Sequence, residues 1–143
     1  MYAHALSFEN PSTGEIERLL RRIKKIAIVG ISASDRRPSY IIARALQGFG
    51  YHITPVNPNL SEVLGKRVYS RLHDLPELTD LVNVFRAPKY VSDIVDECIS
   101  LKIKALWLQD GVVDSVAALR AHNAGLTVVM DRCIYRDYVK LLC

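Results

Sequence analysis

Hydroxyl and guanidinium side chains are concentrated in one short segment, directly after an apolar run that ends at Gly30. The residues that carry these groups are Ser32, Ser34, Arg36, Arg37 and Ser39. An arginine can hold a phosphate through two parallel hydrogen bonds, and each charge-assisted bond contributes about 1.5–3 kcal/mol when well formed. The segment therefore predicts a phosphate site. The competing interpretation is that both arginines are solvated loop charges and that Ser39 only caps a helix.

The elements around this segment favour the phosphate interpretation. Residues 26–30 suit a strand buried on both faces, and residues 41–49 carry apolar side chains at helical spacing. A second strand is predicted over about 51–56, before Asn57 and Pro58. A helix N-terminus that follows such a strand attracts anions through its unpaired N–H groups and its dipole. We therefore predict a βαβ unit that holds a phosphate.

The rest of the chain continues the alternation of strands and helices. Ser12 and Glu15 have the spacing of a capping box, and Asp114 suits the N-cap of a later helix. The further predicted strands cover about 80–85, 105–108 and 127–130, and the predicted helices about 13–24, 88–99, 114–123 and 134–142. Residues 58–79 are predicted to be irregular, with a short helix near 71–75.

This order of elements is typical of the α/β class. We predict a doubly wound, mostly parallel five-stranded sheet with helices on both faces, a Rossmann-like arrangement. It is expected to be one domain over residues 1–143, with a loose lead-in over 1–11. Ligands of such folds bind beyond the carboxyl ends of the strands. The loops at that edge are expected to be 30–39, 57–60, 85–89, 109–114 and 131–133.

Composition limits the functions that the chain can have. Its formal charge of +4 agrees with an anionic ligand but does not require nucleic acid. No apolar run approaches the roughly 18–20 residues that span a membrane. Residues 1–10 lack the layout of a signal peptide, so we expect a cytoplasmic protein. The cysteines are widely spaced and the histidines match no ligand spacing, so neither a disulfide framework nor a metal site is predicted.

The loop after Gly30 departs from the dinucleotide fingerprint. The pattern G-x-G-x-x-G would place glycines where Ser32 and Asp35 stand. NAD sites also hold the ribose with an acid after the second strand, and that corner carries Asn57 and Pro58. Because asparagine can still accept a hydrogen bond, an NAD(P)-linked oxidoreductase or sensor stays open as an alternative.

Short motifs form an ordered set along most of the chain. They are residues 28–32, 37–39, 56–58, 63–65, 84–86, 106–109, 111, 124–126 and 130–133. This set resembles the stand-alone CoA-binding protein family, small proteins similar to the nucleotide-binding domain of the succinyl-CoA ligase α-subunit. The resemblance implies a protein that binds coenzyme A or an acyl-CoA across the strand ends, without catalysis of its own. A homodimer is compatible with it.

The resemblance also implies which residues meet the coenzyme. Backbone groups of Gly30, Ile31 and Ser32 would meet the diphosphate, with Arg36 or Arg37 nearby. Other positions would contact the adenosine or the pantetheine. They are Asn57 and Pro58 for the adenosine, Phe85, Arg86 and Ala87 for the adenine or the start of pantetheine, and Gln109 and Gly111 for the pantetheine arm. A plain surface role is the alternative for Gln109.

Two positions depart from the pattern of the family that the chain resembles. Family members often carry Ala-Ser-Pro after the first glycine, where this chain has Ile-Ser-Ala at residues 31–33. They also often carry a lysine after the Asn-Pro pair, where this chain has Asn59. A phosphate contact made by that lysine would have to come from another cation. The candidates are Lys66, Arg67 and Lys89.

No arrangement of residues predicts catalysis. The phosphorylated histidine of the ligases that the chain resembles lies in a second domain, and no Ser-His-Asp set is recognisable. Cys133 is the reactive candidate, because it follows Arg132 at an expected helix start and both features favour a thiolate. It would either form a mixed disulfide with the CoA thiol or be a buried, inert thiol. Trp107, Leu108 and Cys98 are predicted core residues. A CoA-ligase subunit that needs a partner chain is the remaining alternative.

Overall fold

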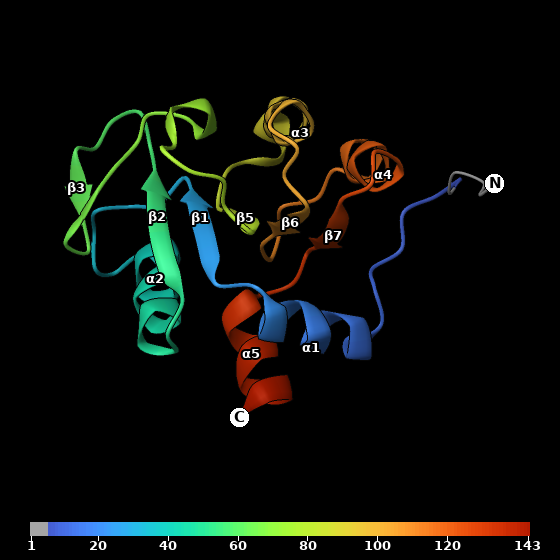
Figure 1. Ribbon diagram of the computed structural model, residues 1–143, viewed down its shortest axis with the longest axis horizontal. Helices are drawn as coiled ribbons and strands as arrows, with labels where there is room; N and C mark the ends of the chain where they lie inside the picture. Colours follow the sequence, from blue (N-terminus) through green and yellow to red (C-terminus); the bar gives the residue numbers. More distant parts are fainter. Residues whose placement is uncertain (1–5) are drawn as a thin grey trace.

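The protein is built around five parallel strands. The computed structural model describes residues 6–143, and its main sheet has the strand order β2-β1-β5-β6-β7 (Figure 1). The strands are β1 (Lys25–Val29), β2 (His52–Val56), β5 (Leu81–Val84), β6 (Ala105–Leu108) and β7 (Thr127–Met130). All pairings in this sheet are parallel. The predicted α/β class and the predicted strands are confirmed, with ends that differ by at most one residue.

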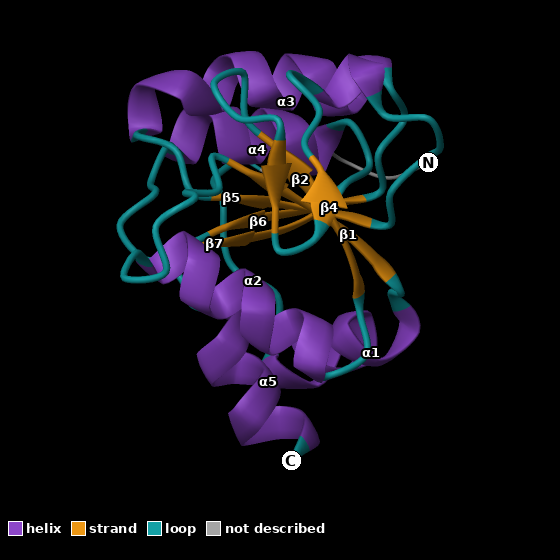
Figure 2. Cartoon of the chain, turned by 90° about the vertical axis from the view of Figure 1, so that its left-hand side faces the viewer, coloured by secondary structure: helices purple, strands orange, loops and turns teal. Residues whose placement is uncertain are grey.

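Helices cover both faces of the sheet (Figure 2). One face carries α3 (Val91–Ser100) and α4 (Ser115–Asn123), and the other carries α1 (Thr13–Arg22), α2 (Pro38–Gly48) and α5 (Ile134–Leu142). A strand buried on both faces points alternate side chains into two cores. In β1, Ala27 and Val29 pack with α3 and α4, whereas Ile26 and Ile28 pack with the other three helices. The predicted doubly wound arrangement is therefore confirmed.

Two of the helices begin at the predicted capping side chains. Ser12 Oγ accepts a hydrogen bond from the N–H of Glu15 at 3.2 Å, and Asp114 Oδ1 accepts one from the N–H of Ala117 at 3.0 Å. Helix α2 differs, because it begins at Pro38, no side chain caps it, and its first turn has no acidic residue. The positive end of the α2 dipole is therefore left uncompensated by its own sequence.

A small hairpin follows β2. Strands β3 (Glu62–Val63) and β4 (Lys66–Arg67) pair antiparallel around Leu64 and Gly65, whose φ angles are 53° and 71°. Positive φ at both central residues is typical of a two-residue hairpin turn. Strands of two residues leave no periodic pattern in a sequence, so the expectation of a wholly irregular segment over 58–79 is wrong at this hairpin.

Two short 3-10 helices lie near the carboxyl edge of the sheet. Helix η1 (Leu72–Asp74) falls within the range 71–75, where a short helix is predicted, and η2 (Pro88–Tyr90) leads directly into α3. None of the helices in residues 6–143 is long and apolar enough to cross a membrane.

The segment before α1 is attached to the edge of the sheet by the side chain of Asn10, and Phe8 packs against the core on the α3 and α4 side. Asn10 Nδ2 donates to the carbonyl of Met130 at 2.9 Å, and the N–H of Met130 donates to Asn10 Oδ1 at 2.8 Å. The expected loose lead-in over 1–11 is thus anchored at Asn10. Its residues 1–5 lie outside the described residues.

Candidate functional site

The order of the strands reverses between β1 and β5. The chain passes from β1 to β2 on one side, and β5 then pairs with β1 on the other side. In sheets of this kind a crevice opens at the carboxyl ends of the strands where the order reverses, and ligands bind there. The loops after β1 and β5 therefore border the expected site, and β2 ends beside them.

Gly30 allows these two loops to touch. Its φ is 86°, in the left-handed region that favours glycine. A Cβ atom at this position would lie 2.5 Å from the carbonyl oxygen of Phe85 and 2.8 Å from Cδ of Arg86. A larger residue would push the loops apart, so the close approach at the crevice depends on this glycine.

Hydroxyl groups in the loop after β1 and at the start of α2 accept hydrogen bonds from the backbone of that loop. Ser39 Oγ accepts a hydrogen bond from the N–H of Ser32 at 2.9 Å, and Ser32 Oγ accepts one from the N–H of Ser34 at 3.0 Å. Ser34 Oγ accepts a longer one, of 3.4 Å, from the N–H of Arg36. Ser39 is buried inside the first turn of α2, and Arg37 is the N-cap, so the interpretation of Ser39 as a helix cap is wrong. These hydroxyls shape the loop.

Asn57 ties the loop after β2 to the loop after β1. Its Nδ2 donates to the carbonyl of Ile31 at 2.8 Å, and its Oδ1 accepts from the N–H of Asn59 at 2.8 Å. Both ends of the amide are engaged within the protein. Asn57 thus fixes the positions of the loops and does not line the cavity, whereas the exposed Pro58 beside it does.

Arg36 and Arg37 stand at the uncapped start of α2. Both are exposed, and neither forms an ion pair within the part of the chain that the structure describes. Two unpaired guanidinium groups beside a helix N-terminus make this corner of the carboxyl edge cationic.

A cavity of about 180 Å³ opens at the carboxyl ends of the first strands. Its walls come from these strand ends, η1 and α3. They are formed by Val29, Gly30, Val56, Pro58, Ser70, Arg71, Leu72, Arg86, Tyr90, Asp93, Ile94 and Glu97. Three predicted site residues, Gly30, Pro58 and Arg86, therefore meet in one cavity.

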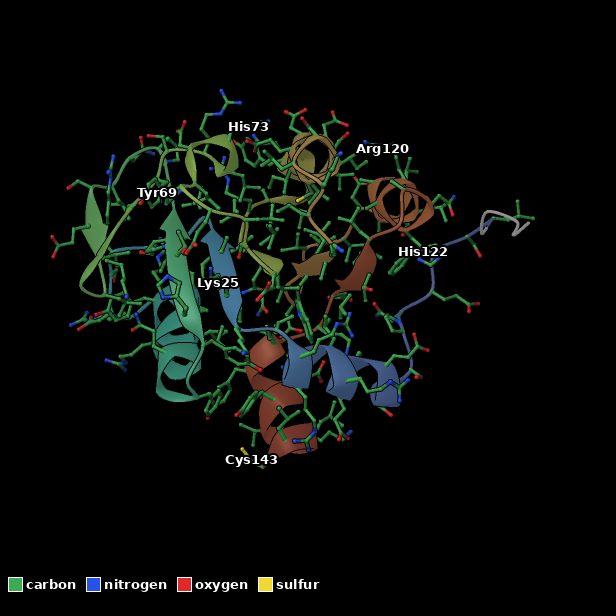
Figure 3. The ribbon with its side chains drawn as sticks, in the orientation of Figure 1. Lys25, Tyr69, His73, Arg120, His122 and Cys143 are labelled. Carbon is green, nitrogen blue, oxygen red and sulfur yellow. The ribbon has the colours of Figure 1, made fainter. Side chains whose placement is uncertain are left out.

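The wall formed by η1 and α3 carries a cluster of charged side chains that no motif in the sequence indicates. Glu97 Oε2 lies 2.6 Å from His73 Nδ1 and 3.8 Å from Arg71 Nε. His73 lies where η1 faces α3 (Figure 3). The carboxylate of Glu97 is therefore held chiefly by His73.

The α3 side of the cavity also carries a stacked pair. The guanidinium of Arg86 lies over the ring of Tyr90, 3.9 Å from its centroid. Tyr90, Asp93 and Glu97 are spaced i, i+3 and i+7 along η2 and α3, which places them on one helical face. That spacing could have pointed to the α3 side of the cavity, but it gives no indication of Arg71 and His73 beside it.

Gln109 is buried, with 3% of the residue exposed. Its Oε1 accepts a hydrogen bond from the N–H of Ile134 at 3.0 Å, so the amide caps the start of α5. The plain surface role considered for Gln109 is wrong, because α5 folds back over the end of β6. Neither Gln109 nor Gly111 lines the cavity; Gly111 is exposed and its N–H donates to Asp131 Oδ1 at 2.8 Å.

Cys133 is the N-cap residue of α5, as predicted, and it is buried. The guanidinium of Arg132 does not act on the Cys133 thiol alone, because it donates two hydrogen bonds to the carboxylate of Asp137, at 2.7 and 2.8 Å. These bonds raise the pKa of Arg132 further. The cation is therefore paired within the protein, and a redox role for Cys133 stays a prediction.

The residues predicted as core are buried. Trp107, Leu108 and Cys98 are all fully enclosed, and Trp107 Nε1 donates to the carbonyl of Arg132 at 2.8 Å. Burial, aided by the neighbouring Glu97 carboxylate, raises the pKa of the Cys98 thiol to about 12. Cys98 is therefore a protonated packing residue at neutral pH.

Comparison with known proteins identifies the family. The family model described as "CoA binding domain" matches residues 24–138. The chain belongs to the CoA-binding domain family. The match covers every strand of the main sheet and the cavity at its carboxyl edge, so the resemblance seen in the sequence is confirmed.

Relatives of this CoA-binding-family chain include both short and much longer proteins. The uncharacterized protein YneT of Bacillus subtilis is 38% identical over 126 residues, which are 88% of this chain and 93% of YneT. The ADP-forming acetate–CoA ligase II of Archaeoglobus fulgidus is 31% identical over 83 residues, which are 57% of this chain but 12% of the ligase. The chain is thus similar to a small part of that enzyme.

Two solved structures share the Rossmann-like fold over nearly their whole length. A hypothetical protein from Pyrococcus horikoshii OT3 superimposes with a TM-score of 0.91 at 32% identity, covering 99% of this chain and 100% of that one. Prb, a PH1109 protein redesigned for binding, gives a TM-score of 0.91 at 35% identity, covering 94% and 95%.

Proposed function

We propose that the protein binds coenzyme A or an acyl-CoA across the carboxyl edge of its sheet and has no catalytic activity of its own. The observation that supports this best is the uncapped N-terminus of α2, which carries Arg36 and Arg37 and follows Gly30 in the same loop. A diphosphate is an anion that such a helix start can hold. Membership of the CoA-binding domain family supports the choice of nucleotide.

The size of the cavity suits one end of the coenzyme. Its volume of about 180 Å³ is below the roughly 300–1,000 Å³ of pockets that enclose drug-sized ligands. The adenosine would occupy the cavity beside Pro58 and the Arg86–Tyr90 pair, and the pantetheine arm would continue along the edge toward Gly111. The residues proposed to contact the coenzyme are Gly30, Ile31, Ser32, Ser34, Arg36, Arg37, Pro58, Phe85, Arg86, Ala87 and Gly111.

Isothermal titration with CoA, acetyl-CoA, NAD and NADP tests the proposal. We expect binding of the CoA species and a marked loss of affinity when Arg36 and Arg37 are both changed to alanine. Arg44→Ala is the matched control, because Arg44 is also exposed on α2 but lies two turns from its N-terminus. Binding of NAD or NADP in place of CoA would overturn the proposal and favour an NAD(P)-linked protein.

A second candidate is a CoA-ligase subunit that acts only with a partner chain. Its support is the similarity to parts of ADP-forming acetate–CoA ligases, 31% identity over 57% and 78% of this chain. Thioester formation by a mixture with a nucleotide-grasping subunit, and by neither chain alone, would favour it. A mixture without activity would leave the binding function as the better account.

A further inference from the structure

The segment after β4 forms a rudimentary extra strand beside β2. Tyr69 pairs in parallel with Val56. The N–H of Tyr69 donates to the carbonyl of Pro55 at 3.0 Å, and the N–H of Asn57 donates to the carbonyl of Tyr69 at 2.9 Å. Tyr69 lies next to the tip of β2 (Figure 3). Because the pairing is parallel, the residues after Tyr69 emerge at the same edge of the sheet as those after β2.

Arg71 reaches the cavity by this route. It follows Tyr69 by two residues and lines the cavity together with Pro58, the residue two positions after Val56. The place after the second strand is where nucleotide-binding folds contact the ribose, with an acid for a free hydroxyl or an arginine for a ribose phosphate. In this chain the corner after β2 has no acid, and the structure supplies an arginine from the neighbouring segment.

The guanidinium of Arg71 is only loosely held. Its side chain is 62% exposed, and its Nε lies 3.8 Å from Glu97 Oε2, beyond hydrogen-bond distance. Its Nη2 lies 3.3 Å from His73 Nδ1. That ring nitrogen is only 2.6 Å from Glu97 Oε2 and must donate its proton to the carboxylate, so it cannot also accept a bond from Arg71. Arg71 is therefore free to bind an anion without leaving a buried charge unpaired.

We propose that Arg71 binds the phosphate monoester on the ribose of the bound nucleotide, which in coenzyme A is the 3′-phosphate. This inference rests on the proposed function and deepens it, because it makes Arg71 the residue that distinguishes CoA from 3′-dephospho-CoA. Arg71 would thereby take the place of the lysine that family members often carry at the position of Asn59. The other candidates for that role, Lys66, Arg67 and Lys89, do not line the cavity. Glu97 opposes the contact, since it attracts the same guanidinium in the empty cavity.

Paired titrations with CoA and 3′-dephospho-CoA test the inference. We expect Arg71→Ala to weaken CoA binding by about 10- to 100-fold, as the loss of one charge-assisted hydrogen bond implies, and to leave dephospho-CoA within about twofold. Arg67→Ala is the matched control, because Arg67 stacks over Tyr69 at 5.0 Å outside the cavity, and it should change neither affinity. Glu97→Gln should strengthen CoA binding and leave dephospho-CoA unchanged. Thermal unfolding of each variant checks that it is folded.

The outcomes separate this inference from the proposed function. If CoA and dephospho-CoA both bind and Arg71→Ala weakens them equally, or not at all, the role of Arg71 is overturned while CoA binding stands. If neither binds, the proposed function fails. Titration with NADP and NAD then decides the inference: a preference for NADP that Arg71→Ala removes supports ribose-phosphate recognition, and no preference overturns it.

Discussion

Asn57 Nδ2 donates a hydrogen bond of 2.8 Å to the carbonyl oxygen of Ile31, and this bond joins the loop after β2 to the loop after β1. The same side chain holds the N–H of Asn59 through Oδ1. One amide thus fixes the relative position of two loops that border the crevice.

Replacing Asn57 with alanine removes both bonds. We expect the free energy of unfolding in urea to fall by about 1–3 kcal/mol, since the carbonyl of the buried Ile31 is left without its bond, and CoA binding to weaken. Asn59→Ala is the control, because Asn59 contributes only its backbone N–H to this network and should change neither quantity. Unchanged stability and affinity in Asn57→Ala would mean that the loops keep their positions without the amide.

Gly30→Ala should be more harmful than a comparable substitution elsewhere. It imposes a positive φ on alanine, which costs about 1–2 kcal/mol, and places Cβ 2.5 Å from the carbonyl oxygen of Phe85. Gly65→Ala isolates the first effect, because its φ is 71° and a Cβ there meets nothing within 4 Å. In thermal unfolding Gly30→Ala should have the lower Tm, and in titration it alone should lose CoA binding. Equal losses in Tm would contradict the close approach of the two loops.

Asn83 is an unexplained polar residue in the core of the sheet. It is fully buried, and neither atom of its amide has a hydrogen-bond partner among residues 6–143. It lies in register with Ile28 of β1 and Trp107 of β6. Because an unpaired buried polar group costs about 1–3 kcal/mol, Asn83→Leu should raise the free energy of unfolding by that order. A lower value in urea unfolding would show instead that the amide has a partner, such as an internal water.

The stability of the protein should fall at alkaline pH. Burial raises the pKa of the Cys98 thiol from 9.0 to about 12, so the folded state binds this proton more tightly than the unfolded chain. The contribution is complete below pH 9.0 and is lost as the pH rises toward 12. One thiol adds a slope of at most about 1.4 kcal/mol per pH unit. In urea unfolding over this pH range, the free energy of unfolding of Cys98→Ala should fall less steeply with pH than that of the unmodified protein. An identical slope would contradict the prediction. Tyr51→Phe removes the parallel effect of the Tyr51 hydroxyl, whose pKa burial also raises.

Cys133 can be tested by intact mass without reductant. If its thiol lies where the thiol end of CoA binds, protein incubated with CoA disulfide gains a CoA-sized adduct that Cys133→Ser lacks, because the Cys133 thiolate attacks the disulfide and one CoA thiol is released. Cys143→Ser is the control, because Cys143 is exposed and reacts with any disulfide that reaches the surface. An adduct that disappears only in the Cys143 variant, or no adduct at all, contradicts the hypothesis.

The regular elements could be predicted because each of them repeats a pattern. Strands such as residues 105–108 are continuous apolar runs, and the helices carry caps and apolar residues at helical spacing. The cavity wall could not be predicted in the same way. Arg71 reaches the site only because one residue, Tyr69, pairs beside β2. The burial of Gln109 could not be predicted for a related reason, since the position of α5 over the end of β6 depends on tertiary packing that spacing does not encode.

Asn10 and Tyr69 each occupy backbone groups at one of the two outer edges of the sheet. The amide of Asn10 occupies backbone groups of Met130 on the outer strand β7, and the backbone of Tyr69 occupies those of Pro55 and Asn57 along the outer strand β2. Unpaired margins are where polypeptides add strands to one another and aggregate. A foreign strand would first have to displace these attachments at Met130 and at Pro55 and Asn57.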